Sequence, residues 1–369
     1  MTKSRLQLPP GASCFSFAEA RRRRALEALV VRVFEGWGYA EIVPPLFDDA
    51  SAFDSSLTPM LYTFTGRDGS TLALRPDFTT LVAKIAAGSL RKVEAPMRLY
   101  YSGEVVRYEA PRAGRQNEFH QMGIEFLGGG GPVADTEAIA IAIECLEAIG
   151  ARDFVVALGH AGLVAALLEA AKLTRDDPRR EATLRSLSRR DPRGVGDAID
   201  GLPAPKGVRH ALIGLAEDTG IRQSLQAARH AVKGIEAAEG AIGDLEATYR
   251  ALDEADLGQR IAIDLSESRG LDYYTGLVFR VYAEGLGVDL GGGGRYDHLL
   301  GTLGRPMNAV GFMLGLDRLS ALSGGQSEDT KAGERPASTG IREETIGASL
   351  RKAREYRRRG QTIRFEGPE

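Results

Sequence analysis

The sequence contains very little cysteine and no long apolar run. Only Cys14 and Cys145 occur among 369 residues, which is typical of a reducing compartment and excludes a disulfide framework. No apolar stretch approaches the roughly 18 residues of a membrane span. Residues 1–13 lack the apolar core of a secretory signal peptide. These absences predict a cytoplasmic protein with no membrane contact.

An excess of positive charge is also missing. The chain has 47 Lys and Arg against 50 Asp and Glu, a formal net charge of -3. Proteins that hold a nucleic acid along a broad surface usually carry a basic excess, so the composition weighs against a large nucleic-acid interface. Arg21 to Arg24 stand near the start of the first expected helix. Because four consecutive side chains point around most of a turn, we interpret them as a solvated surface.

The glycine run at residues 291–294 does not belong to a nucleotide-binding P-loop, because no Gly-Lys-Ser/Thr sequence follows it. Its glycines would instead let the backbone approach a bound molecule closely. We expect no cofactor and no metal centre in this chain.

Helix and strand signals occur in separate groups along the chain. Ser16 and Glu19 form a helix capping box, and an apolar face at helical spacing follows from Leu26 to Trp37. We further expect strands at 39–43, 97–109, 118–127, 154–158, 261–265, 277–282 and 288–290, a hairpin at 61–74, helices at 79–87 and 135–149, and a strand leading into a helix at 310–322. Hairpins combined with segregated helices favour an α+β fold, an antiparallel sheet flanked by helices.

Composition changes divide the chain into four parts. Residues 1–159 and 259–322 carry the strand signals and form the two parts of one core, whereas Ala, Leu and Arg dominate residues 160–258 and predict a mainly helical insertion. Residues 323–369 form a short polar tail, whose end at 349–359 is a basic helix candidate. For this end we favour a solvated or frayed segment over a partner-docking helix.

Three segments place polar residues in otherwise apolar, strand-like surroundings: residues 74–79, 107–125 and 269–276. In the second, Gln121 and Glu125 alternate with apolar residues and therefore share one face of a strand. A polar group on a buried face needs a partner, either another protein group or a ligand. Taken singly, such a residue is more often a satisfied structural residue than a binding residue.

Free histidine has chemistry that matches these segments. Its ammonium group needs a carboxylate and neutral acceptors, its carboxylate suits an amide or a guanidinium, and its imidazole needs an acceptor and a hydroxyl. The corresponding groups are Asp77 and Thr79 for the ammonium, Gln121 or Arg269 for the carboxylate, and Glu125 and Tyr274 for the imidazole.

The segments also resemble, in order, the core of class II aminoacyl-tRNA synthetases, and specifically the histidyl-tRNA synthetase family. The similarity runs from about residue 10 to residue 322. Residues 37–45 resemble motif 1, which builds the dimer interface, residues 107–125 resemble motif 2, residues 310–319 resemble motif 3, and residues 269–274 and 292–297 resemble the two histidine-specific signatures.

The resemblance implies a histidine pocket and a role for each residue in it. The implied lining residues are Asp77, Thr79, Gln121, Glu125, Tyr273, Tyr274 and Tyr296. Arg107 and Arg318 would face the phosphates of ATP, and Arg269 would lie near the reacting acyl group. These guanidiniums can equally hold the carboxylate of bound histidine or belong to buried ion pairs. We therefore include Arg107 and Arg269 among the candidate histidine-binding residues.

The chain departs from the synthetases in four places. Asp77-Phe78-Thr79 stands where they usually have Glu-Gly-Thr, and Ala110 and Asn117 stand where they usually have Arg. After Arg318 only 369 − 318 = 51 residues remain, fewer than the roughly hundred of an anticodon-binding module. The last residues are polar and basic. Asp followed by a large apolar residue and Thr resembles the regulatory paralogues of the family, the regulatory subunits of ATP phosphoribosyltransferase.

The resemblance thus implies a non-catalytic regulatory subunit that mediates feedback inhibition of the first step of histidine biosynthesis. Its implied partners are free histidine as effector, a second copy in a dimer, and the short-form catalytic ATP phosphoribosyltransferase subunit in a hetero-octamer, with no tRNA. Two alternatives stay open at this point. One is a truncated ligase that forms histidyl-adenylate, and the other is a structural scaffold with an inactive pocket.

Overall fold

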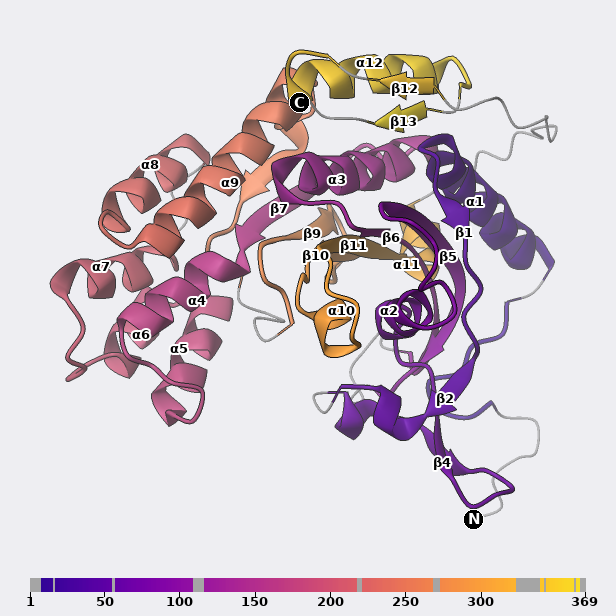
Figure 1. Cartoon of the computed structure of the whole chain (residues 1–369), viewed down its shortest axis with the longest axis horizontal. Helices are drawn as coiled ribbons and strands as arrows, with labels where there is room; N and C mark the ends of the chain where they lie inside the picture. Colours follow the sequence, from indigo (N-terminus) through magenta and orange to yellow (C-terminus); the bar gives the residue numbers. More distant parts are fainter. Residues whose placement is uncertain are drawn as a thin grey trace.

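A computed structural model describes residues 8–15, 17–54, 57–108, 116–217, 221–267, 273–322, 339–341, 343–361 and 363–365 of the chain. An eight-stranded sheet lies at its centre (Figure 1). Helices α1 (Phe17–Gly36) and α3 (Gly131–Ala148) pack against one face, and α2 (Thr79–Ala87) and the short α10 (Leu299–Thr302) pack against the other. This arrangement confirms the predicted fold of a sheet flanked by helices.

The sheet has the strand order β1-β5-β6-β11-β10-β9-β7-β8. Its strands are β1 (Ala40–Glu41), β5 (Met97–Val106), β6 (Glu118–Leu127), β7 (Phe154–His160), β8 (Ile261–Ile263), β9 (Leu277–Ala283), β10 (Gly291–Arg295) and β11 (Ala309–Gly315). The two edge pairs, β1–β5 and β7–β8, are parallel, and all other pairs are antiparallel. The sheet is therefore antiparallel throughout its centre, where the polar segments meet.

Smaller elements complete the core. A three-stranded sheet has the order β2 (Phe47–Asp49), β4 (Thr71–Leu74), β3 (Thr63–Thr65), in which β3 and β4 form the predicted hairpin. Helix α11 (Leu316–Leu322) follows β11, and single 3-10 turns lie at Ala50–Ala52, Thr58–Met60 and Gly258–Arg260.

Helix α1 shows how the apolar spacing produces the packing. Val30, Phe34 and Trp37 are fully buried against the sheet and α3, as the spacing predicts. Ser16 of the expected capping box lies outside the described residues. The interpretation of the four arginines as solvated is wrong for Arg23. Its side chain is largely buried and forms an ion pair with Asp317.

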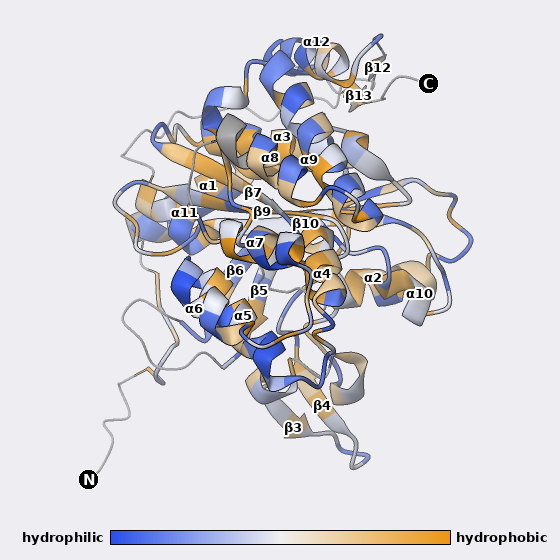
Figure 2. Ribbon diagram, turned by 90° about the vertical axis from the view of Figure 1, so that its left-hand side faces the viewer, coloured by the Kyte–Doolittle hydropathy of each residue, from blue (hydrophilic) through white to orange (hydrophobic). Residues whose placement is uncertain are grey.

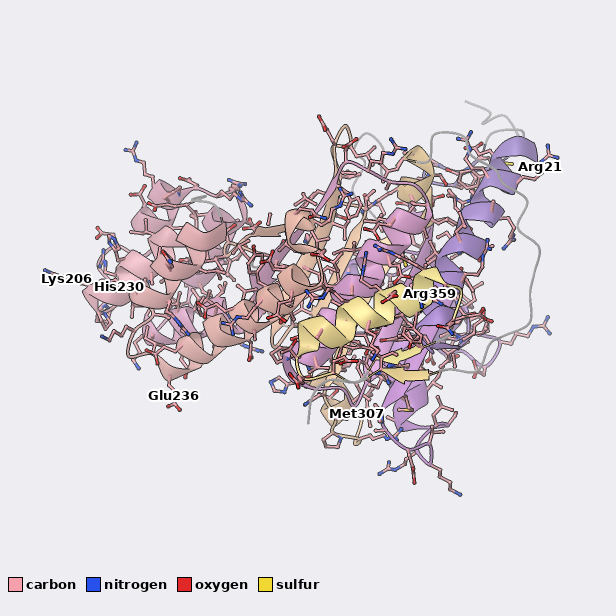
Figure 3. The ribbon with its side chains drawn as sticks, turned by 90° about the horizontal axis from the view of Figure 1, so that it is seen from above. Arg21, Lys206, His230, Glu236, Met307 and Arg359 are labelled. Atoms are coloured by element: carbon pink, nitrogen blue, oxygen red, sulfur yellow. The ribbon has the colours of Figure 1, made fainter. Side chains whose placement is uncertain are left out.

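The described residues of 161–254 form six helices, as the composition predicts: α4 (Ala161–Ala170), α5 (Pro178–Ser188), α6 (Pro192–Ala198), α7 (Lys206–Gly214), α8 (Ile221–Ala231) and α9 (Glu236–Glu254). They extend to one side of the sheet, and Lys206 and His230 project from their outer end (Figure 3). Hydrophilic residues gather on peripheral helices such as α6 (Figure 2). The four-part division of the chain stays a prediction.

The glycine run differs from the expectation. Residues 288–290 are not a strand, and the glycines themselves form β10 between β9 and β11. A Cβ atom added at Gly293 would overlap the carbonyl oxygen of Gly311 on β11. The glycines are thus explained by the close approach of neighbouring strands, without a bound molecule.

The C-terminal end is a helix, as the basic helix candidate at 349–359 predicts, and Arg351, Lys352, Arg358 and Arg359 are exposed, but the expectation of a frayed segment is wrong. Strands β12 (Thr339–Ile341) and β13 (Ile363–Phe365) pair in parallel and are joined through α12 (Ile346–Arg358). Leu350 and Ile363 are fully buried, and the rings of Trp37 and Phe365 lie 5.7 Å apart. The C-terminal unit, β12-α12-β13, is therefore packed onto α1, α3 and α9 (Figure 1).

Among the described residues, no helix has the length and apolarity needed to cross a bilayer.

Candidate functional site

The predicted polar residues of β6 lie on the sheet face that α2 covers. Gln121 is 2% exposed and Glu125 is 1% exposed. Met122 and Ile124 point to the opposite face, where they join the core beneath α1 and α3. The alternation of polar and apolar residues therefore separates a polar site from a packed layer, as the sequence predicts.

Glu125 is the most strongly perturbed group of this site. The hydroxyl of Tyr296 donates a hydrogen bond to Glu125 Oε2, and Thr79 also bonds the carboxyl group. Burial raises the pKa of Glu125 to about 8, because these hydrogen bonds offset only part of the loss of solvation. Glu125 is therefore largely protonated at pH 7, in spite of its hydrogen bonds.

Three tyrosines form an aromatic wall beside Glu125. The rings of Tyr273 and Tyr296 lie 5.3 Å apart, and those of Tyr273 and Tyr274 lie 5.2 Å apart. Burial raises the pKa of Tyr274 to about 12, and it also raises the pKa values of the other two, so all three hydroxyls remain donors. Among the described residues, the buried Tyr273 hydroxyl has no well-formed hydrogen bond, although Thr79 lies near enough to influence its pKa.

Asp77 has a structural role that the sequence pattern does not reveal. Its Oδ1 atom accepts a hydrogen bond of 2.9 Å from the backbone N–H of Thr80 in the first turn of α2. Burial raises the pKa of Asp77, and the two hydrogen bonds from Thr80 oppose this effect. The carboxylate therefore caps α2 and remains beside Thr79 at the edge of the site.

Phe78, which stands where the synthetases usually have glycine, is 1% exposed. Its ring stacks on Tyr101 at 4.2 Å with an interplanar angle of 9°, and the Arg75 guanidinium lies 4.2 Å from the ring centroid. A Cβ atom at Gly103 of β5 would come within 3.1 Å of the Phe78 ring and 2.7 Å of Arg75. Phe78 and Arg75 therefore fill the sheet face next to the site, above Gly103.

Tyr101 belongs to the site although the sequence did not single it out. It pairs with Gly123 across β5 and β6, and a Cβ atom at Gly123 would lie 2.5 Å from the Tyr101 hydroxyl. Gly123 stands between Gln121 and Glu125 on the site face. A glycine between two polar residues on one strand face can indicate that a large side chain of the neighbouring strand lies over the glycine.

The predicted arginines are only partly brought to the site. Arg318 donates hydrogen bonds of 2.6 Å to the backbone oxygen and to Oδ1 of Asp289. Arg107 lies over the ring of Phe119, 4.8 Å from its centroid. Arg269 and Ala110 lie outside the described residues, so their predicted roles stay predictions.

A buried ion pair fixes the second histidine signature. Arg295 bonds Asp135 Oδ1 at 2.6 Å and the backbone oxygen of Gly131 at 3.0 Å at the start of α3. Burial raises the pKa of Asp135 to about 6, although Arg295 acts in the opposite direction. This pair holds the segment that carries Tyr296 against α3.

Within the described ranges, no group of three or more His, Cys, Asp or Glu residues is arranged to hold a metal ion.

An antiparallel sheet of this topology, with buried polar and tyrosine side chains on one face of its central strands, defines a class II aminoacyl-tRNA synthetase-like core. The chain matches the histidyl-tRNA synthetase family over residues 14–319. It is 38% identical over 367 residues to the ATP phosphoribosyltransferase regulatory subunit of Moorella thermoacetica, covering 98% of this chain and 92% of that protein. The chain therefore belongs to the histidyl-tRNA synthetase family, in its group of ATP phosphoribosyltransferase regulatory subunits.

Two further proteins are similar to this chain, one in sequence and one in structure. The histidine–tRNA ligase of Methanocaldococcus jannaschii is 34% identical over 319 residues, covering 85% of this chain and 74% of that protein. A crystal structure from Bacillus halodurans, described as an ATP phosphoribosyltransferase regulatory subunit/histidyl-tRNA synthetase, superposes with a TM-score of 0.78 at 28% identity, over 98% of this chain and 93% of that one. The chain is thus similar in sequence to a ligase as well as to regulatory subunits.

Proposed function

We propose that this chain is the non-catalytic regulatory subunit of an ATP phosphoribosyltransferase and binds free histidine in the pocket around Glu125. The names of its relatives support the regulatory role. With that role we infer a place at the first step of histidine biosynthesis, in the cytoplasm. The observation that carries the histidine proposal is a buried carboxyl group surrounded by tyrosine hydroxyls.

The chemistry of imidazole explains why this arrangement suits histidine. A neutral imidazole has one N–H donor and one bare nitrogen acceptor. Glu125 would accept from the N–H, and a tyrosine hydroxyl such as Tyr273 or Tyr274 would donate to the other nitrogen. Because the pKa of Glu125 is about 8, its carboxyl group keeps its proton at pH 7 and would donate that O–H to the bare nitrogen of a neutral imidazole in the alternative orientation of the ring. Thr79, Asp77 and Gln121 would hold the ammonium and carboxylate groups.

Two features support a role without adenylation. The guanidinium of Arg318, which would face the ATP phosphates in a synthetase, is neutralised by Asp289, and that carboxylate also lies 3.4 Å from Arg280. Phe78 fills space that a glycine would leave open in the synthetases. A triphosphate would have to displace the Asp289 carboxylate, which weakens any ATP site.

Self-association is supported by an apolar surface that follows the motif 1 segment. Val43 is 80% exposed, and Phe47 and Phe64 are 49% and 42% exposed. The two phenylalanine rings contact each other at 5.7 Å across the small sheet. Exposed large apolar side chains that contact one another, as Phe47 and Phe64 do, are typical of a protein interface. We place the dimer contact here, and we expect dimers to combine with the short-form catalytic subunit in a hetero-octamer.

The alternative function is a ligase that forms histidyl-adenylate, which the similarity to a histidine–tRNA ligase favours. Pyrophosphate exchange separates the two. With histidine, Mg²⁺ and ATP, the purified chain should show no exchange above a protein-free control, whereas an authentic histidyl-tRNA synthetase assayed in parallel should. Robust histidine-dependent exchange would sink the proposal of a non-catalytic subunit.

The scaffold alternative is tested by calorimetry with free histidine. We expect saturable binding by the chain alone or with its catalytic partner. No binding in either state, with assembly intact, would favour a scaffold with an inactive pocket.

A further inference from the structure

A cavity lies between α1, α3 and α12, away from the proposed histidine site around Glu125. Its volume is about 350 Å³. The helices α1 and α3 cover the opposite face of the sheet from α2, so this cavity and the Glu125 pocket are separated by the sheet. In Figure 3, α12 lies across the molecule with Arg359 near its end. A ligand in this cavity would not compete with histidine for the same groups.

Guanidinium groups dominate the lining of the α12 cavity. Arg354, Arg357 and Arg358 come from α12, and Arg32 comes from α1. The two carboxyl groups in the lining are already engaged by protein donors. Glu147 accepts a 2.8 Å hydrogen bond from Arg354, and Glu144 accepts one of 2.7 Å from the Trp37 indole.

Two donors at this cavity are buried without an acceptor. Among the described residues, neither Nη1 of Arg354 nor Nε of Arg357 has a hydrogen-bond partner. Arg354 is only 5% exposed. Buried charged donors in proteins are normally paired, because burial removes the water that would otherwise satisfy them. The lining of the cavity therefore contains buried hydrogen-bond donors for which the described residues supply no acceptor.

The backbone is shaped to admit these groups. A Cβ atom at Gly36, the last residue of α1, would overlap the guanidinium of Arg357. Arg357 is held in place by its hydrogen bond of 2.7 Å to the backbone oxygen of Gln361. Burial also lowers the pKa of Arg357, opposed by the charge of Glu144. The desolvated guanidinium would gain from an anion placed beside it.

We propose that the α12 cavity is a binding site for a small anion that carries a phosphate or carboxylate group. Guanidinium groups bind both of these groups through paired hydrogen bonds. Leu29, Val33 and Ala148 give the cavity an apolar side. Its volume falls in the range of small-molecule sites, roughly 300–1,000 Å³, so it takes a molecule larger than a bare phosphate ion.

Calorimetry of the full chain at constant ionic strength tests this site with three probes: inorganic phosphate, ribose 5-phosphate and succinate. We expect saturable binding of at least one. Binding of the two phosphates alone identifies a phosphate site, and binding of all three identifies a general anion site. Absence of saturable binding with all three probes overturns the proposal.

Variants locate the site. Arg357→Gln and Arg358→Gln should each weaken binding by about tenfold, the usual effect of losing a charged hydrogen bond. Arg359→Gln is the matched control, because Arg359 lies on the same helix outside the lining and pairs with Glu355. Arg358 is exposed, so its substitution tests the site without disturbing the packing of α12. Equal affinities in all three variants and the unaltered chain would contradict the proposal.

Discussion

Glu125 concentrates the chemistry of the pocket in one side chain. Its carboxyl group is almost completely buried and bonds Tyr296, and the surrounding groups are hydroxyls and aromatic rings rather than cations. Such surroundings hold a proton on the carboxyl group without an ion-pair partner. A ligand that brings its own basic nitrogen then meets a proton donor and acceptor at the same place.

Substitution of Glu125 tests this assignment directly. Glu125→Ala should weaken histidine binding by about 10- to 100-fold, because the buried imidazole loses its hydrogen-bond partner and one of its polar atoms is left unsatisfied. Calorimetry with free histidine measures the change. Glu118→Ala is the matched control, since Glu118 is exposed at the start of the same strand. If Glu125→Ala binds histidine as tightly as the unaltered chain, the effector site lies elsewhere.

The pKa of Glu125 also predicts a pH dependence of stability. The folded pKa is about 8 against an ordinary value of 4.5, so the folded state binds the proton more tightly than the unfolded state. The contribution of this group is therefore fully present below pH 4.5 and is lost as the pH rises through 8. Asp135 and Asp77 titrate with the same sign, so the comparison must isolate Glu125.

Denaturant unfolding between pH 4.5 and pH 9 makes this comparison. The free energy of unfolding should fall more steeply with pH in the unaltered chain than in Glu125→Gln, which cannot ionise. Identical slopes for the two proteins would show that Glu125 keeps an ordinary pKa in the folded chain.

At the scale of elements, the C-terminal unit contributes to the stability of the fold. Phe365 is 1% exposed and packs its ring on Trp37, and its backbone oxygen accepts a 3.0 Å hydrogen bond from Arg98. Phe365→Ala should therefore lower the free energy of unfolding by about 3–5 kcal/mol, the usual cost of deleting a buried phenylalanine. Chemical denaturation measures it.

The control for that experiment is Arg359→Ala. Its side chain is exposed and pairs only with Glu355 among the described residues, so its effect should stay within about 0.5 kcal/mol. If the two substitutions lower the free energy of unfolding by equal, small amounts, the C-terminal unit does not contribute to the stability of the fold.

The sequence predicted the elements with strong periodicity and failed where tertiary contacts decide. The limits of β6 and α2 agree with the expected ranges, because apolar spacing and flanking turn residues determine both. The C-terminal unit was misjudged because its many basic residues hid an apolar stripe through Leu350 and Ala353. Charge composition alone does not show that long arginine side chains lie along a packed surface.

The pocket shows the same division. The alternation around Glu125 revealed which side chains share a face, but the capping of α2 by Asp77 and the contact of Arg318 with Asp289 depend on distant segments. The position of Phe78 between Arg75 and Tyr101 is likewise a tertiary contact. No local pattern in a single sequence encodes these pairings.

At the scale of the whole molecule, regulation requires histidine to favour one state of an assembly over another. A ligand that binds both states equally shifts neither, however tightly it binds. The proposed histidine site lies on the central strands of the large sheet, and the apolar surface around Phe47 and Phe64 lies on the small sheet. Strand β4 of the small sheet is followed by α2, and the segment between them contains Asp77. This segment connects the proposed effector site with the proposed dimer surface.

The most direct test of the central claim is the activity of a short-form ATP phosphoribosyltransferase, measured with and without this chain and with increasing free histidine. The proposed function predicts that the chain stimulates a catalytic subunit that is weak alone, and that histidine reverses the stimulation. With Glu125→Ala, stimulation should persist and inhibition by histidine should be lost. A catalytic subunit whose activity is unchanged by the chain, at concentrations where both proteins are folded, would contradict the account.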